Sequence, residues 1–305
     1  MRPIPRWLCA ALLAATACGQ QVADPNFNTR VADPAFTSAH PRVGIDESHK
    51  NFHTKDGRYK PFAALMASDG FTVAAAPKFT QDALKAIDIL VVANALGNED
   101  WNKPKPAFSA AECDAVRDWV RAGGSLLLIA DHAPFGDSAA VLAQRFGVDM
   151  GRGFAADRKN SEKNPTLLVF SVENGLLGDH EIIRGRNGQE RVRTIVAFTG
   201  QSLSVPKDGA ALMKLGNDAV EVATREELQD FASGKQVGKS VAGRAQGIAM
   251  AFGKGRVAMF GEAAMFSAQV AGSGAQAFKM GMNAEGNDDR QFALNVMHWL
   301  ARALD

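Results

Sequence analysis

Ionisable side chains in this sequence gather directly after apolar segments. Asp131 and His132 follow the unbroken apolar run 126–130, and a polar group follows the short segment 42–45. Such a run is typical of a strand buried on both faces, so each group is expected where a strand ends. Carboxylates beside imidazoles suit the binding of zinc or another divalent cation, and also acid and base catalysis on water. The residues of this candidate site are Asp46, Glu47, His49, His53, Asn94, Asp131, His132 and Glu262.

Two sets of roles follow from these residue types. The candidate catalytic groups are Asp46, Glu47, His49, Asp131, His132 and Glu262, and the candidate ligands of a divalent metal ion are His49, Asp131 and His132. A structural role is the alternative for Asp46 and Asp131, because an aspartate at a strand end also caps the next helix and fixes its turn. Two imidazoles beside carboxylates are costly to bury unless they are paired or liganded, which favours function for His49 and His132.

Alternating strands and helices position these residues. A capping box formed by Ser109 and Glu112 opens one of the expected helices. The alternation predicts an α/β fold, with a doubly wound, mainly parallel sheet and helices on both faces. In such sheets ligands bind outside the carboxyl ends of the strands, which is where the candidate site is expected. The strands are predicted at 42–45, 71–75, 87–93 and 125–130.

The pattern changes in the middle third of the chain. Residues from about 150 to 245 are predicted to form a β-rich insertion or an extension of the sheet, with a brief helix over 226–231. A hairpin over 246–262 then returns to the core sheet, and a glycine-rich loop is expected over 272–286. A last helix begins after Asn287. The shorter β segments are expected at 166–172, 192–198, 211–215 and 219–223.

The first residues predict export. Two arginines precede the apolar stretch 7–17, which is too short to span a bilayer, and residues 15–17 form a small-residue cleavage pattern. Residues 1–17 are therefore expected to be a signal peptide, and the protein is expected outside the cytoplasm. The segment ending at Cys18 resembles a bacterial lipoprotein signal, although Ala15 stands where leucine is usual. This resemblance implies a lipid on Cys18 on the periplasmic side of a bacterial membrane, and ordinary cleavage before Cys18 is the alternative.

The part of the chain after the signal divides into a tether and one domain. Residues 18–39 contain two copies of a Val-Ala-Asp-Pro-x-Phe repeat, at 22–27 and 31–36, and are expected to tether the domain 40–305. A formal net charge of +1 and the lack of long like-charge runs give no reason to expect nucleic acid, so a small molecule or an envelope protein is the expected partner. Cys113 stands alone in the domain, so no internal disulfide framework is expected.

The order of several short motifs resembles a known family. Residues 87–92, 119–124 and 125–131 look like the class I glutamine amidotransferase fold. More narrowly, the chain resembles the divergent branch found in ThuA-like proteins and in envelope proteins related to gliding-motility transporter subunits. The resemblance covers 41–304 and implies a flavodoxin-like sheet. Supporting motifs lie at 46–49, 179–183, 260–262 and 295–300.

One departure from the family bears on mechanism. The amidotransferases place a nucleophilic cysteine after the central strand, whereas this strand ends in Asp131 and His132. The resemblance therefore excludes glutamine hydrolysis through a cysteine. Two functions stay open: a domain that binds a small ligand, with carbohydrate as one class, or that scaffolds an envelope complex, and a hydrolase that uses the Asp and His cluster with a metal ion or with acid and base chemistry.

Overall fold

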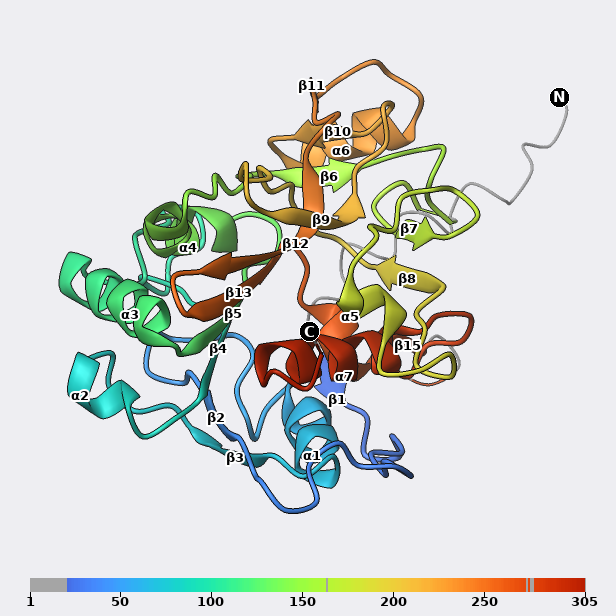
Figure 1. Cartoon of the computed structure of the whole chain (residues 1–305). Coiled ribbons are helices and arrows are strands. Elements are labelled where there is room, and N and C mark those ends of the chain that lie inside the picture. Colours follow the sequence, from blue (N-terminus) through green and yellow to red (C-terminus); the bar gives the residue numbers. More distant parts are fainter. Residues whose placement is uncertain (1–20, 163, 273, 275–276, 305) are drawn as a thin grey trace, which may run out of the picture.

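The computed structural model describes residues 21–304 except 163, 273, 275 and 276. Its centre is a seven-stranded sheet with the order β3-β2-β4-β5-β13-β12-β9 (Figure 1). The first five strands in this order run parallel, and β12 and β9 extend the sheet by antiparallel pairing. The strands are β2 (Arg42–Ile45), β3 (Thr72–Ala75), β4 (Ile89–Ala93), β5 (Ser125–Ile129), β9 (Ala210–Lys214), β12 (Ala245–Phe252) and β13 (Gly255–Phe260). The predicted α/β fold with a mainly parallel sheet is confirmed.

Helices cover both faces of this sheet, which explains why its central strands are apolar throughout. Val91 of β4 lies in a core with α1 and α7, whereas its neighbours Leu90 and Val92 lie in a second core with α2, α3 and α4. Successive side chains of a strand point to opposite faces, so each face of β4 packs against a different helical layer. The helices are α1 (Lys60–Ser68), α2 (Gln81–Leu84), α3 (Ala110–Ala122), α4 (Phe135–Ala143) and α7 (Asp289–Leu300), and α4 continues into the short 3-10 helix η2 (Gln144–Phe146).

Local sequence fixes the helix that precedes the central strand. Ser109 accepts the backbone N–H of Glu112, and the Glu112 carboxylate accepts the backbone N–H of Ser109, so the predicted capping box is confirmed. Gly123 ends α3 at a φ of 131°, a conformation that residues with a side chain rarely adopt. The chain then enters β5, whose carboxyl end leads to Asp131.

The middle third is rich in β structure, as the sequence predicts. β7 (Leu168–Ser171) pairs with β8 (Thr194–Ala197), and β10 (Val220–Val222) lies between β6 (Phe154–Ala156) and β11 (Lys239–Ser240). β9 joins the main sheet instead, so this region is partly an insertion and partly a sheet extension. Two short helices, α5 (Glu181–Arg184) and α6 (Arg225–Ala232), connect these strands.

A small antiparallel sheet differs from the sequence prediction. β14 (Ala268–Ala271) lies between β1 (Gln21–Ala23) and β15 (Phe278–Gly281), and it follows the 3-10 helix η3 (Ala264–Phe266). Residues 278–281 were expected within a glycine-rich loop, and β1 within a tether. Both predictions are corrected here, because each of these short segments gains its strand conformation by pairing with β14.

The N-terminal strap, residues 24–36, also lies against the domain. The backbone N–H groups of Val31 and Ala35 donate to Ser68 Oγ and Asp69 Oδ1, each at 2.9 Å. The rings of Phe36 and Phe71 lie 4.6 Å apart. The phenylalanines of the repeat therefore dock on the core, and the described part of the expected tether is a packed segment of the fold.

Candidate functional site

Four predicted residues lie together at the carboxyl edge of the sheet. Asp46 and Asn94 follow β2 and β4 directly, and Asp131 and Glu262 follow β5 and β13 after one residue. These four strands are neighbours in the sheet, so their carboxyl ends meet at one edge. The Asn94 side chain accepts the backbone N–H of Asp131 at 2.9 Å and thus connects two of the strand ends.

His49 belongs to a network that joins β2 to α3. Its Nδ1 contacts Asp46 Oδ2 at 2.8 Å, and its Nε2 contacts Glu112 Oε1 at 3.3 Å. Burial alone would lower the pKa of His49, but the hydrogen bonds and charges of Asp46 and Glu112 raise it above its usual value. Both ring nitrogens are thus occupied by carboxylates, and the Phe79 and Phe108 rings lie 4.7 Å from the imidazole. The arrangement is that of a structural ion-pair network.

Asp131 and Glu262 form a second group, in which two acids influence each other. Glu262 is 1% exposed and accepts the backbone N–H groups of Ala264 and Met265 at 2.6 and 2.9 Å. Burial, and next the charge of Asp131, raise the pKa of Glu262 to about 8. Burial raises the pKa of Asp131 to about 7, although the hydrogen bonds from the His132 N–H and from Asn94 act to lower this pKa. Asp131 keeps part of its surface exposed, so it is the member of the pair that a ligand can reach.

Two further buried side chains, those of His53 and Tyr59, form hydrogen bonds beside this group. Asn94 Nδ2 donates to His53 Nδ1 at 3.1 Å, and Tyr59 OH donates to the Ala263 carbonyl at 3.0 Å. Burial, together with the charge of Arg58, lowers the pKa of His53 to about 3, so this imidazole is neutral. Tyr59 faces the charges of Glu262 and Asp131 within the same buried group.

His132 is neutral, and the hydrogen bond of one ring nitrogen fixes the role of the other. Its Nδ1–H donates to the Ala133 carbonyl at 2.7 Å, and its ring stacks on Phe154 at 4.9 Å. Burial lowers the pKa of His132 to about 4, and the charge of Arg225 acts in the same direction. Because Nδ1 carries the proton, Nε2 is a hydrogen-bond acceptor.

An aromatic rim lies beside these polar groups. Trp101 is 41% exposed, and its ring lies 5.3 Å from the rings of both Phe52 and Phe135. Phe135 in turn lies 6.3 Å from His132. We use aromatic rim for Phe52, Trp101, Phe135 and Phe154. The only hint of it in the sequence is a tryptophan in the polar loop that follows β4.

The structure separates the remaining predicted residues. Glu47 is exposed, and its Oε1 accepts the backbone N–H of Lys55 at 2.7 Å. Within the described residues, no three His, Cys, Asp or Glu side chains are grouped so that they could hold a metal ion. The predicted metal set of His49, Asp131 and His132 is therefore not assembled, because His49 is bound by Asp46 and Glu112. Cys113 is buried, and burial raises the pKa of its thiol to about 11, which agrees with a packing role.

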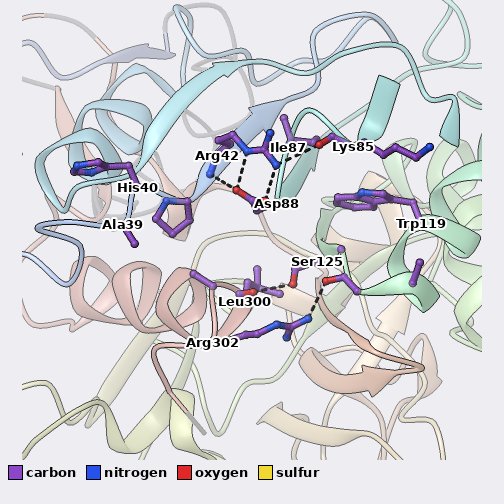
Figure 2. Close-up of a pocket in the computed structure, with 15 residues that line it drawn as sticks. Ala39, His40, Arg42, Lys85, Ile87, Asp88, Trp119, Ser125, Leu300 and Arg302 are labelled. Atoms are coloured by element: carbon purple, nitrogen blue, oxygen red, sulfur yellow. Dashed lines mark hydrogen bonds and ion pairs between the residues drawn. The ribbon is translucent and has the colours of Figure 1, made fainter. Parts of the chain in front are cut away.

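A cavity of about 620 Å³ lies at the opposite edge of the sheet, among the amino ends of β2, β4 and β5 (Figure 2). Its polar side chains form an ion pair and hydrogen bonds at the ends of helices and strands. Arg42 pairs with Asp88 at 2.8 Å, Ser125 Oγ donates to the Leu300 carbonyl at 2.7 Å, and Arg302 donates to the Gly123 carbonyl at 2.8 Å. We therefore assign this cavity a structural role and place the candidate site at the carboxyl edge.

Comparison with solved structures shows the fold alone. The N-terminal domain of mmIFT52 superimposes with a TM-score of 0.58 at 16% identity, over 85% of this chain and 97% of that domain. Cytoplasmic protein STM3548 from Salmonella typhimurium has a TM-score of 0.47 at 12% identity, over 85% and 98% of the two chains. A protein described as ThuA-like from Bacteroides uniformis has a TM-score of 0.45 at 13% identity, over 91% and 95%. No protein-family model matches the sequence, and no curated protein matches it.

Proposed function

We propose that this domain binds a small uncharged polar ligand, of the carbohydrate class, at the carboxyl edge around Asp131. The observation that carries the proposal is the exposed Trp101 in an aromatic rim beside Asp131 and His132. Sites for small molecules combine aromatic walls with a few convergent polar groups that fix the orientation of the ligand. A sugar suits such a wall, because its C–H groups pack on a ring while its hydroxyls bond to polar side chains.

The protonation states favour an uncharged ligand. The pKa of Asp131 is about 7, and the pKa values of His132 and His53 are about 4 and about 3. Near neutral pH the Asp131 carboxyl is partly protonated and the His132 imidazole is neutral, so these two accessible groups supply hydrogen-bond donors and acceptors with little charge of their own.

Titration of the purified domain with a panel of mono- and oligosaccharides tests the proposal. Trp101→Ala and Asp131→Asn are expected to weaken the binding of a sugar found in this panel by at least about tenfold. The first change removes the aromatic surface on which the sugar packs, and the second removes the carboxyl that bonds to its hydroxyls. Phe278→Ala is the matched control, because Phe278 is 45% exposed on β15. Equal affinity in the wild type and in both site variants would disprove the proposed site.

A hydrolase acting at the same edge is the second candidate. The observation that favours it is the Asp131–Glu262 pair, whose pKa values of about 7 and about 8 lie where a general acid or base works at neutral pH. Hydrolysis of a bound sugar by the wild type, with Asp131→Asn retaining some binding but no turnover, would support it. Binding without turnover in the wild type would leave the first proposal alone.

The narrower fold assignment belongs to the same proposal. The parallel strands follow the spatial order β3-β2-β4-β5-β13, which is the 2-1-3-4-5 order of flavodoxin-like sheets when they are counted along the chain. Together with the motif order, this supports a divergent amidotransferase-like domain in which Asp131 and His132 follow the strand that carries the family's cysteine. The domain would then retain a ligand crevice without the cysteine chemistry.

We also propose that the protein acts in the bacterial envelope, anchored through a lipid on Cys18. Residues 1–20 lie outside the described residues, so the support comes from the basic start, the apolar stretch 7–17 and the cleavage pattern. No helix among the described residues is long and apolar enough to cross a membrane. Mass analysis of the mature protein tests the assignment, since lipidation adds acyl chains that Cys18→Ser would lack.

A further inference from the structure

We propose that Arg225 is a specificity-determining residue of the candidate site, where its guanidinium donates a hydrogen bond to a hydroxyl of the bound sugar beside His132. This inference rests on the proposed sugar binding at the carboxyl edge, and it adds the group that selects among sugars. Arg225 is exposed and is the first residue of α6. It is not among the residues that the sequence predicts for the site.

Strand pairing brings Arg225 to the aromatic rim. In the small sheet, Val222 of β10 is the register partner of Phe154 of β6. α6 begins soon after Val222, because Thr224 Oγ1 accepts the backbone N–H of Glu227 at 3.1 Å and caps the helix. The helix therefore lies beside β6 and β10 (Figure 1). The guanidinium carbon of Arg225 lies 5.6 Å from the centre of the Phe154 ring.

The same phenylalanine contacts His132. The His132 ring stacks on Phe154 at 4.9 Å, and the backbone N–H of Ala133 donates to the Gly153 carbonyl at 3.2 Å. Burial and, in addition, the charge of Arg225 lower the pKa of the His132 imidazole. Two different parts of the chain, the edge of the main sheet and the small sheet, thus hold His132 and Arg225 at one ring.

The guanidinium of Arg225 retains its hydrogen-bonding capacity, unlike that of Arg158. Arg158 lies 3.8 Å from the centre of the Phe231 ring, and it donates to the backbone carbonyls of Phe231 and Lys235. Arg225 forms no hydrogen bond or ion pair with any residue that the structure describes. Its N–H donors are therefore available to a ligand.

The position of Arg225 is unfavourable for the helix itself. The N-terminus of a helix carries a partial positive charge, so a cation in the first turn is destabilising, whereas the next two residues, Glu226 and Glu227, suit it. Residues that break a local rule of this kind are expected at functional sites. The location of Arg225 thus favours a role in ligand contact over a role in helix stability.

Hydrogen-bond balance indicates what Arg225 contacts. His132 Nε2 is an acceptor, because Nδ1 carries the proton, so a sugar hydroxyl beside it donates its own proton there. The oxygen of that hydroxyl keeps lone pairs that need a donor, and a guanidinium supplies N–H groups at any working pH. A hydroxyl that both donates to His132 and accepts from Arg225 is strongly selected, since a sugar without it leaves both groups unpaired.

Binding measurements with deoxy sugars test the inference. A sugar that the domain binds is compared with its deoxy analogues, each of which lacks one hydroxyl. The proteins are the wild type, Arg225→Met, which keeps an unbranched side chain without donors, and Arg225→Lys, which restores a donor. Arg121→Met is the matched control, because Arg121 lies 5.3 Å from the centre of the Phe252 ring and is 59% exposed at the end of α3.

The expected result is a penalty that depends on Arg225. One deoxy analogue should bind the wild type at least about tenfold more weakly than the parent sugar. This penalty should be several-fold smaller in Arg225→Met, since both changes remove the same hydrogen bond, and it should return in part in Arg225→Lys. Arg121→Met should retain the pattern of the wild type.

A second readout needs no ligand. In an NMR titration, Arg225→Met should raise the pKa of His132, whereas Arg121→Met should leave it unchanged. Equal deoxy penalties in Arg225→Met and the wild type would overturn the role of Arg225, while weaker binding by Trp101→Ala would still support the sugar site. If the wild type binds no sugar, the proposed function fails, and this inference fails with it.

Discussion

The two acids Asp131 and Glu262 give the stability of this domain a defined pH dependence. Their pKa values of about 7 and about 8 lie above the ordinary carboxyl range, so the folded chain holds protons that an unfolded chain releases. Their contribution to stability is therefore complete below the ordinary range and is lost as the pH rises through about 7 and about 8.

Glu262→Gln is expected to remove one of these titrations. From the ordinary carboxyl range up to about pH 8, the free energy of unfolding of the variant should improve relative to that of the wild type by up to about 1.4 kcal/mol per pH unit, and above about pH 8 the difference should level off. Denaturant unfolding of both proteins across this range measures the difference, in which the titrations of the other groups largely cancel. A difference that stays constant with pH would contradict the raised pKa of Glu262.

His49 is expected to behave as a structural residue. His49→Ala leaves the buried Asp46 without its imidazole partner and should cost about 3 kcal/mol of unfolding free energy. Because the pKa of His49 is raised, this stabilisation is complete below the ordinary histidine range and is lost as the pH rises through the raised value. The cost should therefore be larger at low pH than at high pH.

Lys50→Ala is the control for this prediction, because the Lys50–Glu99 ion pair is exposed, at 53% and 89%, and should contribute almost nothing. Thermal unfolding of both variants measures the two effects. Equal stability of His49→Ala and the wild type at low pH would show that the network does not stabilise the fold.

The sequence predicts the residues that follow long apolar runs and misses their distant partners. Asp46, Asn94, Asp131 and Glu262 lie at the predicted edge because each follows a strand that the apolar pattern reveals. Glu112 is identifiable as a helix cap, but its contact with His49 joins positions 63 residues apart. Local patterns carry no information about such a contact, which is why His49 was expected in the functional group.

At the scale of elements, the N-terminal strap is expected to contribute to stability. Phe36 packs against Phe71 and lies 6.2 Å from the His298 ring, so Phe36→Ala should lower the unfolding free energy by about 2 kcal/mol. Thr37→Ala is the control, because Thr37 is exposed. Denaturant midpoints measure both variants, and an unchanged midpoint for Phe36→Ala would show that the segment is a tether after all.

The length of a helix or strand decides whether it can be predicted from the sequence. The five-residue apolar strands β4 and β5 and the capped helix α3 carry strong local signals and were predicted. β1, β11 and β15 have two to four residues each and depend on pairing with distant strands. A short strand of this kind has little intrinsic preference, so its partner decides its conformation.

At the scale of the whole molecule, the two edges of the sheet have different roles. The amino edge contains the cavity of about 620 Å³, whose charged side chains bond to the carbonyls at helix ends. The carboxyl edge contains acids with raised pKa values, neutral imidazoles and an exposed tryptophan. The amino edge is thus more open, but its polar groups already have hydrogen-bond partners within the protein. The carboxyl edge retains polar groups that a ligand can use.

The most direct test of the central claim is a crystal structure of the domain with a sugar that binds it in solution. We predict that the sugar lies at the carboxyl edge, with a ring face on Trp101 and hydroxyls within hydrogen-bond distance of Asp131 and His132 Nε2. A sugar seated instead among Arg42, Asp88 and Trp119 in the cavity at the amino edge would contradict the proposed site.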